Sequence, residues 1–108
     1  MKIINKALLQ QFKDNNSSGD EWLDAWCLKI SQETWKKPTD ILTSFPKAQL
    51  LKNNSVCFEN SENNYVVVVS IHYLTQSVSI QYVGSPHKVS HLSTTHDSVI
   101  RQFMHVIH

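Results

Sequence analysis

Apolar side chains recur with a helical period between Asp20 and Ile30. Trp22, Trp26 and Ile30 stand four residues apart, which places them on one face of an α-helix. Asp20 is a favourable N-cap residue, and Pro38 ends the region because the residue before a proline avoids helical geometry. The pattern predicts an amphipathic helix that begins at Asp20 and turns its aromatic face toward a core.

Two shorter helical segments flank this helix. Apolar residues at helical spacing over Ile3–Phe12 predict a first helix, which the polar turn formers of residues 14–19 (DNNSSG) end. Farther along the chain, Thr39 can cap a short helical turn that stops before Pro46. The first part of the chain is therefore expected to be helical.

After residue 48 the spacing of the apolar residues changes from the helical period of 3.6 residues to the strand period of 2. Four short segments are rich in β-branched and aromatic residues, and polar turns separate them. We expect four strands, mainly antiparallel, with the helices packed on one face of the sheet. The strands are predicted over Gln49–Leu51, Val56–Phe58, Tyr65–Tyr73 and Val78–Val83.

Two of these strands have different burial patterns. Val66–Val69 is a continuous apolar run, which is typical of a central strand that is covered on both faces. In the last strand Val78, Ile80 and Tyr82 alternate with polar residues, which is typical of a half-buried strand. The long valine strand is therefore expected at the centre of the sheet.

The elements together predict an α+β fold in a single domain over residues 1–108. At this length the chain can bury one core and hold one site. After the strands, Asp97 can open a last helix, whose apolar residues are Val99, Ile100, Phe103, Met104 and Ile107.

Charge and composition narrow the classes of function. Ten Lys and Arg against nine Asp and Glu give a net charge of +1, so any RNA contact must come from a local patch. Arg101 is the single arginine, although arginine is the preferred bidentate partner of phosphate. No apolar run approaches the roughly 18 residues of a membrane span, and the N-terminal residues do not read as a signal peptide. We expect a cytoplasmic protein without membrane contact, in which Cys27 and Cys57 are buried free thiols.

The histidines do not form a recognisable metal motif. His87 and His91 have i, i+4 spacing, but no glutamate completes an HExxH motif and no cysteine pair lies nearby. A hydrolase triad is equally unsupported, because the chain has no GxSxG and Cys27 lies on a helix face assigned to the core. We expect no metal and no cofactor.

Cleavage of RNA without a metal needs only residues of the types that this chain has. The 2′-hydroxyl of the substrate is the nucleophile, so the protein must remove a proton, donate a proton and hold the charged phosphate. Histidine exchanges a proton near neutral pH, which makes His72 and His87 candidate acid–base groups, and Lys52 and Lys88 can offset charge on the phosphate. Tyrosines such as Tyr65 offer faces for base stacking. The alternative is that the tyrosines belong to the sheet core and His72 is a surface residue of a strand.

Several strings resemble a known family of small bacterial toxins. Residues 35–41 read WKKPTDI, residues 51–58 read LKNNSVCF, and residues 63–65 read NNY before the valine strand. In order and spacing these strings resemble the HigB family of type II toxin–antitoxin toxins, in the RelE/ParE superfamily, over roughly residues 1–92. The resemblance implies helices against a curved antiparallel sheet and metal-independent cleavage of mRNA on the translating ribosome (an mRNA interferase). It also implies neutralisation by a helix-turn-helix antitoxin, HigA-like, that represses the operon.

The site residues carried over by the resemblance are fewer than in many relatives. Ser55 and Gln81 stand where relatives commonly have basic residues, and Pro86 displaces the family histidine to His87. The resemblance leaves Lys52 for charge stabilisation and His87 for acid–base chemistry, with His72 as a further candidate. The RNA-binding residues it implies are Asn53, Asn54, Tyr65, Gln81 and Lys88.

Two readings of function follow from this. One is an attenuated ribosome-dependent endoribonuclease that attacks through the 2′-hydroxyl and leaves a cyclic phosphate. The alternative is a catalytically inactive interaction protein that binds a helix-turn-helix antitoxin and modulates its repression. A gyrase inhibitor of the ParE type shares the fold but not the quoted strings.

Overall fold

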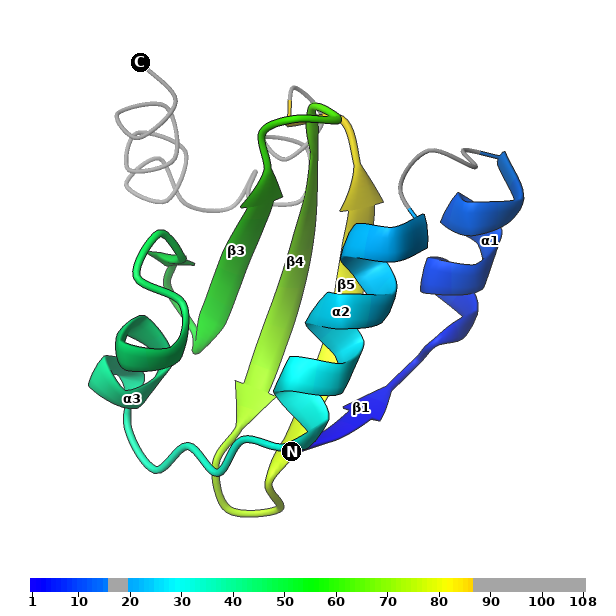
Figure 1. Ribbon diagram of the computed structural model, residues 1–108. Coiled ribbons are helices and arrows are strands. Elements are labelled where there is room, and N and C mark those ends of the chain that lie inside the picture. Colours follow the sequence, from blue (N-terminus) through cyan, green and yellow to red (C-terminus); the bar gives the residue numbers. More distant parts are fainter. Residues whose placement is uncertain (16–19, 87–108) are drawn as a thin grey trace.

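A five-stranded mixed sheet covered by helices on one face makes up the described part of the chain. The computed structural model describes residues 1–15 and 20–86 (Figure 1). The strand order is β1-β5-β4-β3-β2, with β1 parallel to β5 and all other pairs antiparallel. The elements are β1 (Lys2–Ile4), α1 (Ala7–Asn15), α2 (Asp20–Ser31), α3 (Pro38–Ser44), β2 (Gln49–Leu50), β3 (Ser55–Asn60), β4 (Tyr65–His72) and β5 (Ser77–Gly84).

The α+β class, the helix from Asp20 and the central position of the valine strand are confirmed. In β4, Val66, Val67 and Val69 are at most 1% exposed, and the strand lies between β3 and β5. Both faces of β4 are therefore covered, as a continuous run of valines indicates. The predicted last helix from Asp97 lies outside the described residues.

The start of the chain differs from the prediction. Instead of one helix over Ile3–Phe12, the chain forms strand β1, in which Ile3 pairs with Val78, and then helix α1 from Ala7. Asn5 separates them with a φ of 68°, and its side-chain amide donates to the Ile80 carbonyl oxygen at 3.1 Å. The backbone groups of Lys2–Ile4 find their partners in β5. This pairing therefore outweighs the helical spacing of the apolar residues at the start of the chain.

Helix α3 also begins earlier than predicted. Its N-cap position is Lys37 rather than Thr39, and Pro38 opens the helix. The Asp40 carboxylate accepts hydrogen bonds from the backbone N–H groups of Lys36 and Lys37 at 2.9 and 3.3 Å. The acidic side chain in the first turn thus binds amides at the start of the helix.

The helices pack on one face of the sheet, as expected (Figure 1). Leu23 and Ile30 of α2 and Ile41 of α3 have no exposed surface, and Trp35 between these helices is 1% exposed. The sheet residues beneath them are Val56, Phe58, Tyr65, Val67, Val69, Ile71, Val78 and Ile80. The main hydrophobic core therefore lies between the helices and this face of the sheet.

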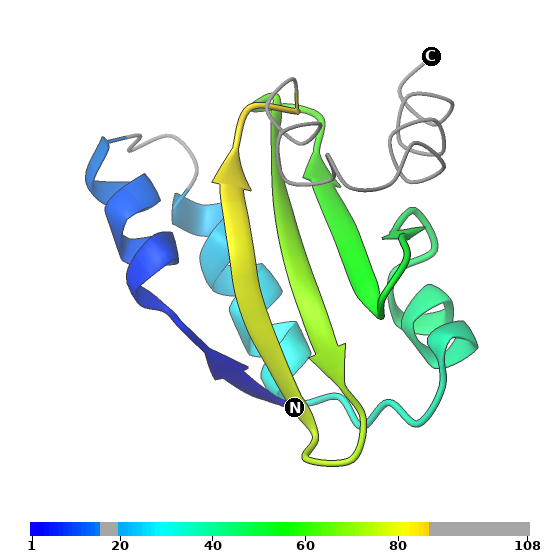
Figure 2. The ribbon, with the colours of Figure 1, turned by 180° about the vertical axis from the view of Figure 1, so that it is seen from behind.

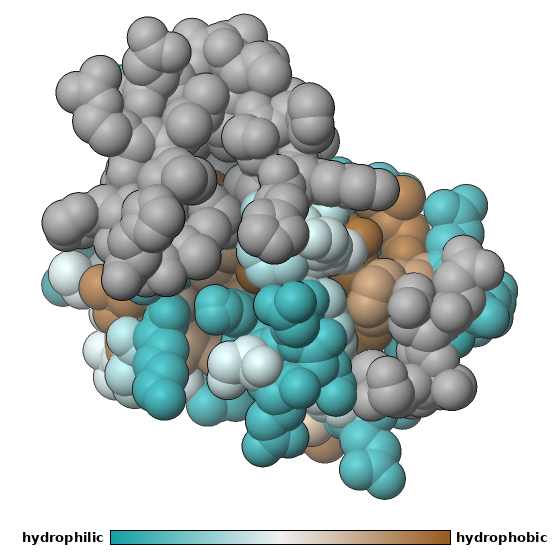
Figure 3. Space-filling view, turned by 90° about the horizontal axis from the view of Figure 1, so that it is seen from above, coloured by the Kyte–Doolittle hydropathy of each residue, from teal (hydrophilic) through white to brown (hydrophobic). Residues whose placement is uncertain are grey.

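Seen from behind, β3, β4 and β5 carry no described helix in front of them (Figure 2). We call this side the open face. It holds a smaller apolar cluster of Cys57, Val66 and Val68, with Leu51 and Tyr82 against it. From above, polar side chains occupy most of the described surface, with apolar patches between them (Figure 3).

A β-bulge in β5 changes the expected alternation. Val68 pairs with Tyr82 while Val69 pairs with Ile80, so Gln81 is an extra residue. The prediction placed Tyr82 on the same face as Ile80, and this was wrong: Ile80 lies in the main core and Tyr82 in the cluster on the open face. The bulge therefore turns two consecutive residues, Gln81 and Tyr82, away from the helices.

None of the helices within residues 1–15 and 20–86 is long and apolar enough to cross a bilayer. Cys57 is buried and Cys27 is half-buried, and both thiols are free. Burial raises the pKa of Cys57 to about 12, and burial also raises the pKa of Cys27. Neither thiol is in a state that favours nucleophilic attack.

Candidate functional site

A tight turn presents Lys52 at the edge of the open face. Asn53 and Asn54 have φ values of 60° and 59°, and the Ser55 N–H donates to the Lys52 carbonyl oxygen at 3.2 Å. Two consecutive residues with positive φ and this hydrogen bond define a type I′ turn, in which asparagine is favoured. The two asparagines thus have a clear structural role, and Lys52, Asn53 and Asn54 are all exposed.

The turn is joined to the end of β4, where His72 lies. The Ile71 N–H donates to the Asn54 carbonyl oxygen at 2.8 Å, and His72 is the next residue. Because Val66 and Val68 belong to the cluster on the open face, alternation places Ser70 and His72 on that face as well. The structure therefore brings the Lys52 turn and His72 to one end of the open face.

Three serines from three strands lie in a row beside this turn. Ser55 pairs with Ser70, and Ser70 pairs with Ser79, so their side chains stand next to one another on the open face. All three are partly exposed. Their hydroxyl groups can donate hydrogen bonds to phosphate oxygens without adding charge. Sequence reasoning missed this row, because it depends on register across the sheet rather than on a local motif.

Gln81 and Tyr82 extend the row toward the other end of β5. The Gln81 amide donates to the Ser79 hydroxyl at 3.4 Å, and the Tyr82 hydroxyl donates to the Ser85 carbonyl oxygen at 2.6 Å. Burial raises the pKa of Tyr82, whose ring lies against the apolar cluster. Gln81 is exposed and remains a candidate for contact with RNA.

Tyr65 lies in the core instead of on the open face. It is 3% exposed, with its ring centroid 5.6 Å from that of Trp22 and 4.6 Å from that of Phe12. Its ring packs edge-on against Trp22, so it presents no free face to a base. The alternative reading of Tyr65 as a core residue therefore describes its place in the fold.

His87 and Lys88 lie outside the described residues. Gly84, three residues before His87, pairs with Val66, while the Lys52 turn adjoins Ile71 at the other end of β4. At about 3.3 Å per residue, these two levels of the strand, five residues apart, are separated by roughly 17 Å. The geometry of the site thus rests on Lys52 and His72.

The electrostatics of the open face are weak. Within residues 1–15 and 20–86 the chain has no arginine, and Lys52 is the cation in the turn. The described residues also contain no cluster of three or more histidine, cysteine or acidic side chains that could hold a metal ion. The arrangement provides one cation, one imidazole and a set of neutral hydrogen-bond donors on this face of the sheet. These groups suit the binding of a phosphodiester more than the cleavage of a buried small molecule.

Comparison with known proteins identifies the family. Residues 20–88 match the model of HigB_toxin, described as the RelE-like toxic component of a toxin–antitoxin system. Curated proteins give no match. The matched segment covers more than half of the chain and includes α2, α3, the Lys52 turn and the strands of the open face. The chain therefore belongs to the HigB toxin family, the RelE-like toxic components of toxin–antitoxin systems.

Proposed function

We propose that this toxin is an endoribonuclease that cleaves mRNA on the ribosome without a metal ion. The observation that carries the proposal is the hydrogen bond that ties the Lys52 turn to Ile71, the residue before His72, in the sheet of a RelE-like toxin. The proposed partner that neutralises it is a helix-turn-helix antitoxin, and the proposed compartment is the cytoplasm.

The reaction needs three roles, and the site offers residues for them. A base takes the proton of the 2′-hydroxyl, whose oxygen then attacks the adjacent phosphorus, and an acid protonates the departing 5′-oxygen. His72 is proposed for one proton transfer, and Lys52 is proposed to offset the charge that builds on the phosphate. His87 is proposed for the other transfer, which requires the chain after Gly84 to return toward the Lys52 end of the sheet. The products are a 2′,3′-cyclic phosphate and a free 5′-hydroxyl.

The RNA is held mainly by neutral donors in this proposal. Asn53, Asn54 and Gln81 are exposed around the row of serines, and Lys88 is proposed as a further cationic contact. A hydrogen bond to a charged group contributes about 1.5–3 kcal/mol, so a site with few cations binds phosphate less tightly than an arginine-rich one. We therefore expect an attenuated enzyme that depends on the ribosome to position the message.

Controlled expression tests the proposal. The wild-type chain and the variant Lys52→Ala/His72→Ala are induced in growing bacteria, and mRNA 5′ ends are mapped. Wild-type induction should arrest growth and create new 5′-hydroxyl ends within translated messages, and the double variant should not. Purified toxin should cut message that is bound to ribosomes but leave free RNA intact.

The weak electrostatics of the open face favour a second candidate. In that case the chain is an inactive member of the family that binds its antitoxin and tunes repression of the operon. Normal growth and intact messages on induction, together with a stable antitoxin complex, would replace the enzyme proposal with this one.

A further inference from the structure

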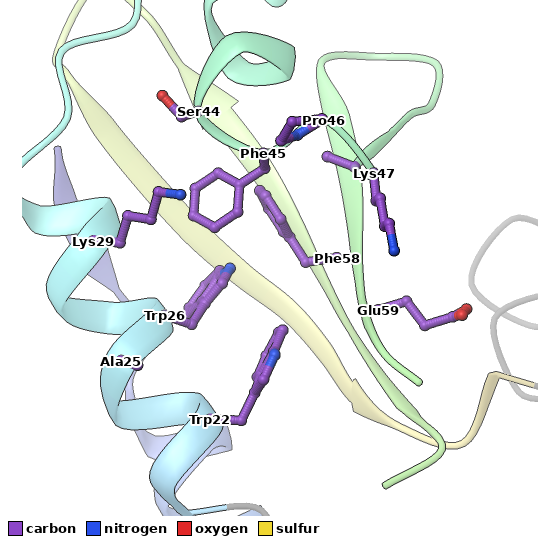
Figure 4. Close-up of a pocket in the computed structure, with 11 residues that line it drawn as sticks. Trp22, Ala25, Trp26, Lys29, Ser44, Phe45, Pro46, Lys47, Phe58 and Glu59 are labelled. Atoms are coloured by element: carbon purple, nitrogen blue, oxygen red, sulfur yellow. The ribbon is translucent and has the colours of Figure 1, made fainter. Parts of the chain in front are cut away.

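A pocket of about 410 Å³ lies on the side of the sheet that carries the helices (Figure 4). Trp22 and Trp26 of α2 border it on one side, Phe45 and Pro46 after α3 border it on the other, and Phe58 of β3 lies between them. None of the residues assigned to RNA cleavage lines it. The pocket is thus a feature separate from the candidate catalytic site.

The pocket walls are aromatic rings that hold one another in place. The centroids of Trp26 and Phe58 are 5.4 Å apart, those of Phe45 and Phe58 are 4.9 Å apart, and both pairs meet edge-on. Trp22 stacks on Trp26 at 6.4 Å. Rigid aromatic surfaces lose little conformational entropy on binding and are enriched in the energetic centres of protein interfaces.

The rim of the pocket is predominantly basic. Lys29 holds its ammonium group 4.5 Å from the centroid of the Phe45 ring, and Lys47 lines the other side. Both lysines are exposed, and neither forms an ion pair within the part of the chain that the structure describes. Glu59 is the one acidic residue of the lining. The charge balance therefore suits a ligand with carboxylates around an apolar centre.

One buried donor at the wall has no acceptor. Trp26 is only 3% exposed, and its buried indole nitrogen has no hydrogen-bond partner among the described residues. In Figure 4 its nitrogen end faces the space that Phe45 and Phe58 border. An unpaired buried donor is unfavourable, so an oxygen that reaches it after a small shift of a wall residue supplies the missing hydrogen bond.

We propose that this pocket is the docking site for an acidic segment of the antitoxin, which inserts an apolar side chain between the tryptophans and Phe45. The inference rests on the pairing with an antitoxin in the proposed function. A polypeptide is the proposed occupant because the family is paired with an antitoxin and because both exposed lysines line the pocket beside its apolar walls. The carboxylates of the segment face Lys29 and Lys47.

The indole signals of the full-length ¹⁵N-labelled chain test the contact directly. The probe is the protein encoded by the reading frame adjacent to this gene. On its addition, the indole N–H signals of Trp22 and Trp26 should shift. The Trp35 signal should shift less, because Trp35 is 1% exposed and does not line the pocket, although its N–H donates at 3.2 Å to the hydroxyl of Ser44, which does.

A pair of variants on α2 tests the charge argument. Ala25 is exposed and lines the pocket, so Ala25→Glu places a carboxylate beside an acidic ligand and should raise the Kd about tenfold or more. Leu28→Glu is the matched control, because Leu28 is 61% exposed on the same helix and does not line the pocket. It should leave the Kd unchanged. Circular dichroism checks that both variants are folded.

The outcomes separate the two proposals. Tight binding of Ala25→Glu with unshifted Trp22 and Trp26 signals overturns the docking site and leaves the toxin–antitoxin pairing intact. Absence of any complex with the wild-type chain overturns that pairing and the docking with it, whereas mRNA cleavage on induction is judged independently. Trp26 signals that move when the free chain is diluted would show a second copy in the pocket and also overturn the inference.

Discussion

The backbone N–H of Ile71 donates to the carbonyl oxygen of Asn54 at 2.8 Å, which ties the turn that carries Lys52 to the end of the strand that carries His72. This hydrogen bond joins two segments that belong to separate sequence motifs. It gives the candidate site a fixed geometry on one end of the open face. The predictions that follow begin with this turn.

The structural and functional roles of the asparagines can be separated. Glycine adopts positive φ without strain, so Asn53→Gly and Asn54→Gly should keep the turn and leave the free energy of unfolding within about 0.5 kcal/mol of wild type. If the amide side chains bind RNA, cleavage should fall in these folded variants. Urea denaturation and primer extension on a reporter message measure the two effects. Asn54→Val, which resists positive φ, should lower stability as well.

Single substitutions at Lys52 and His72 should reduce cleavage without unfolding the chain. Both side chains are exposed, so removing them leaves the core intact. Loss of a group that transfers a proton in the transition state costs about 10²- to 10⁴-fold in rate, and we expect His72→Ala to fall in this range. Lys36→Ala, at an exposed position before α3, is the control. Equal cleavage rates for His72→Ala and the control would remove His72 from the mechanism.

Deletion of Gln81 should be tolerated by the fold. Because Gln81 is the extra residue of the bulge, its removal leaves Ile80 opposite Val69 and Tyr82 opposite Val68. Deletion of Ser79 is the control, since it turns Ile80 away from the core and should unfold the chain. Thermal melts of the two deletions compare them. A strongly destabilised Gln81 deletion would contradict the assigned register.

Two leucines of α2 should respond very differently to truncation. Leu23 has no exposed surface and Leu28 is 61% exposed. Leu23→Ala leaves a cavity between α2 and the sheet and should cost about 2–5 kcal/mol of unfolding free energy. Leu28→Ala should change it by less than about 0.5 kcal/mol. Guanidinium titrations at pH 7 measure both values, and similar losses would mean that α2 buries a different face.

Alkaline pH should destabilise the chain partly through Cys57. Its pKa is about 12 in the folded chain against an ordinary value of 9.0, so the folded state retains the thiol proton longer than the unfolded state. The stabilising contribution of Cys57 is complete below pH 9 and is lost as the pH rises from 9 toward 12. Cys57→Ala should be less stable at pH 7 but should show a flatter decline above pH 9. An unchanged alkaline slope would contradict the assignment.

Local signals in the sequence were sufficient for α2 and for the turn. The four-residue spacing of Trp22, Trp26 and Ile30 indicates a helix without reference to its tertiary contacts. Consecutive asparagines likewise favour positive φ. The strand at Ile3 could not be read in the same way, because it is stabilised by pairing with Val78 far along the chain. Non-local pairing of this kind leaves no local pattern.

The motif residues of the candidate site could be predicted from the sequence, but the residues around them could not. Lys52 stands out through its motif, whereas the row of serines exists only once β3, β4 and β5 are in register. Tyr65 has the composition of a base-stacking residue but is drawn into the core by Phe12 and Trp22, which come from helices. The pocket likewise depends on how α2 and the segment after α3 pack.

The parallel pairing of β1 with β5 sets an order of events during translation. Lys2–Ile4 leaves the ribosome first, yet its partner residues Ser77–Ser79 belong to β5, the last strand of the described sheet to be translated. A nascent chain released before β5 is complete keeps an unpaired N-terminal segment and an unfinished sheet. A chain terminated before β5 thus lacks the strand that pairs with both β1 and β4, so the sheet of the described fold cannot be completed.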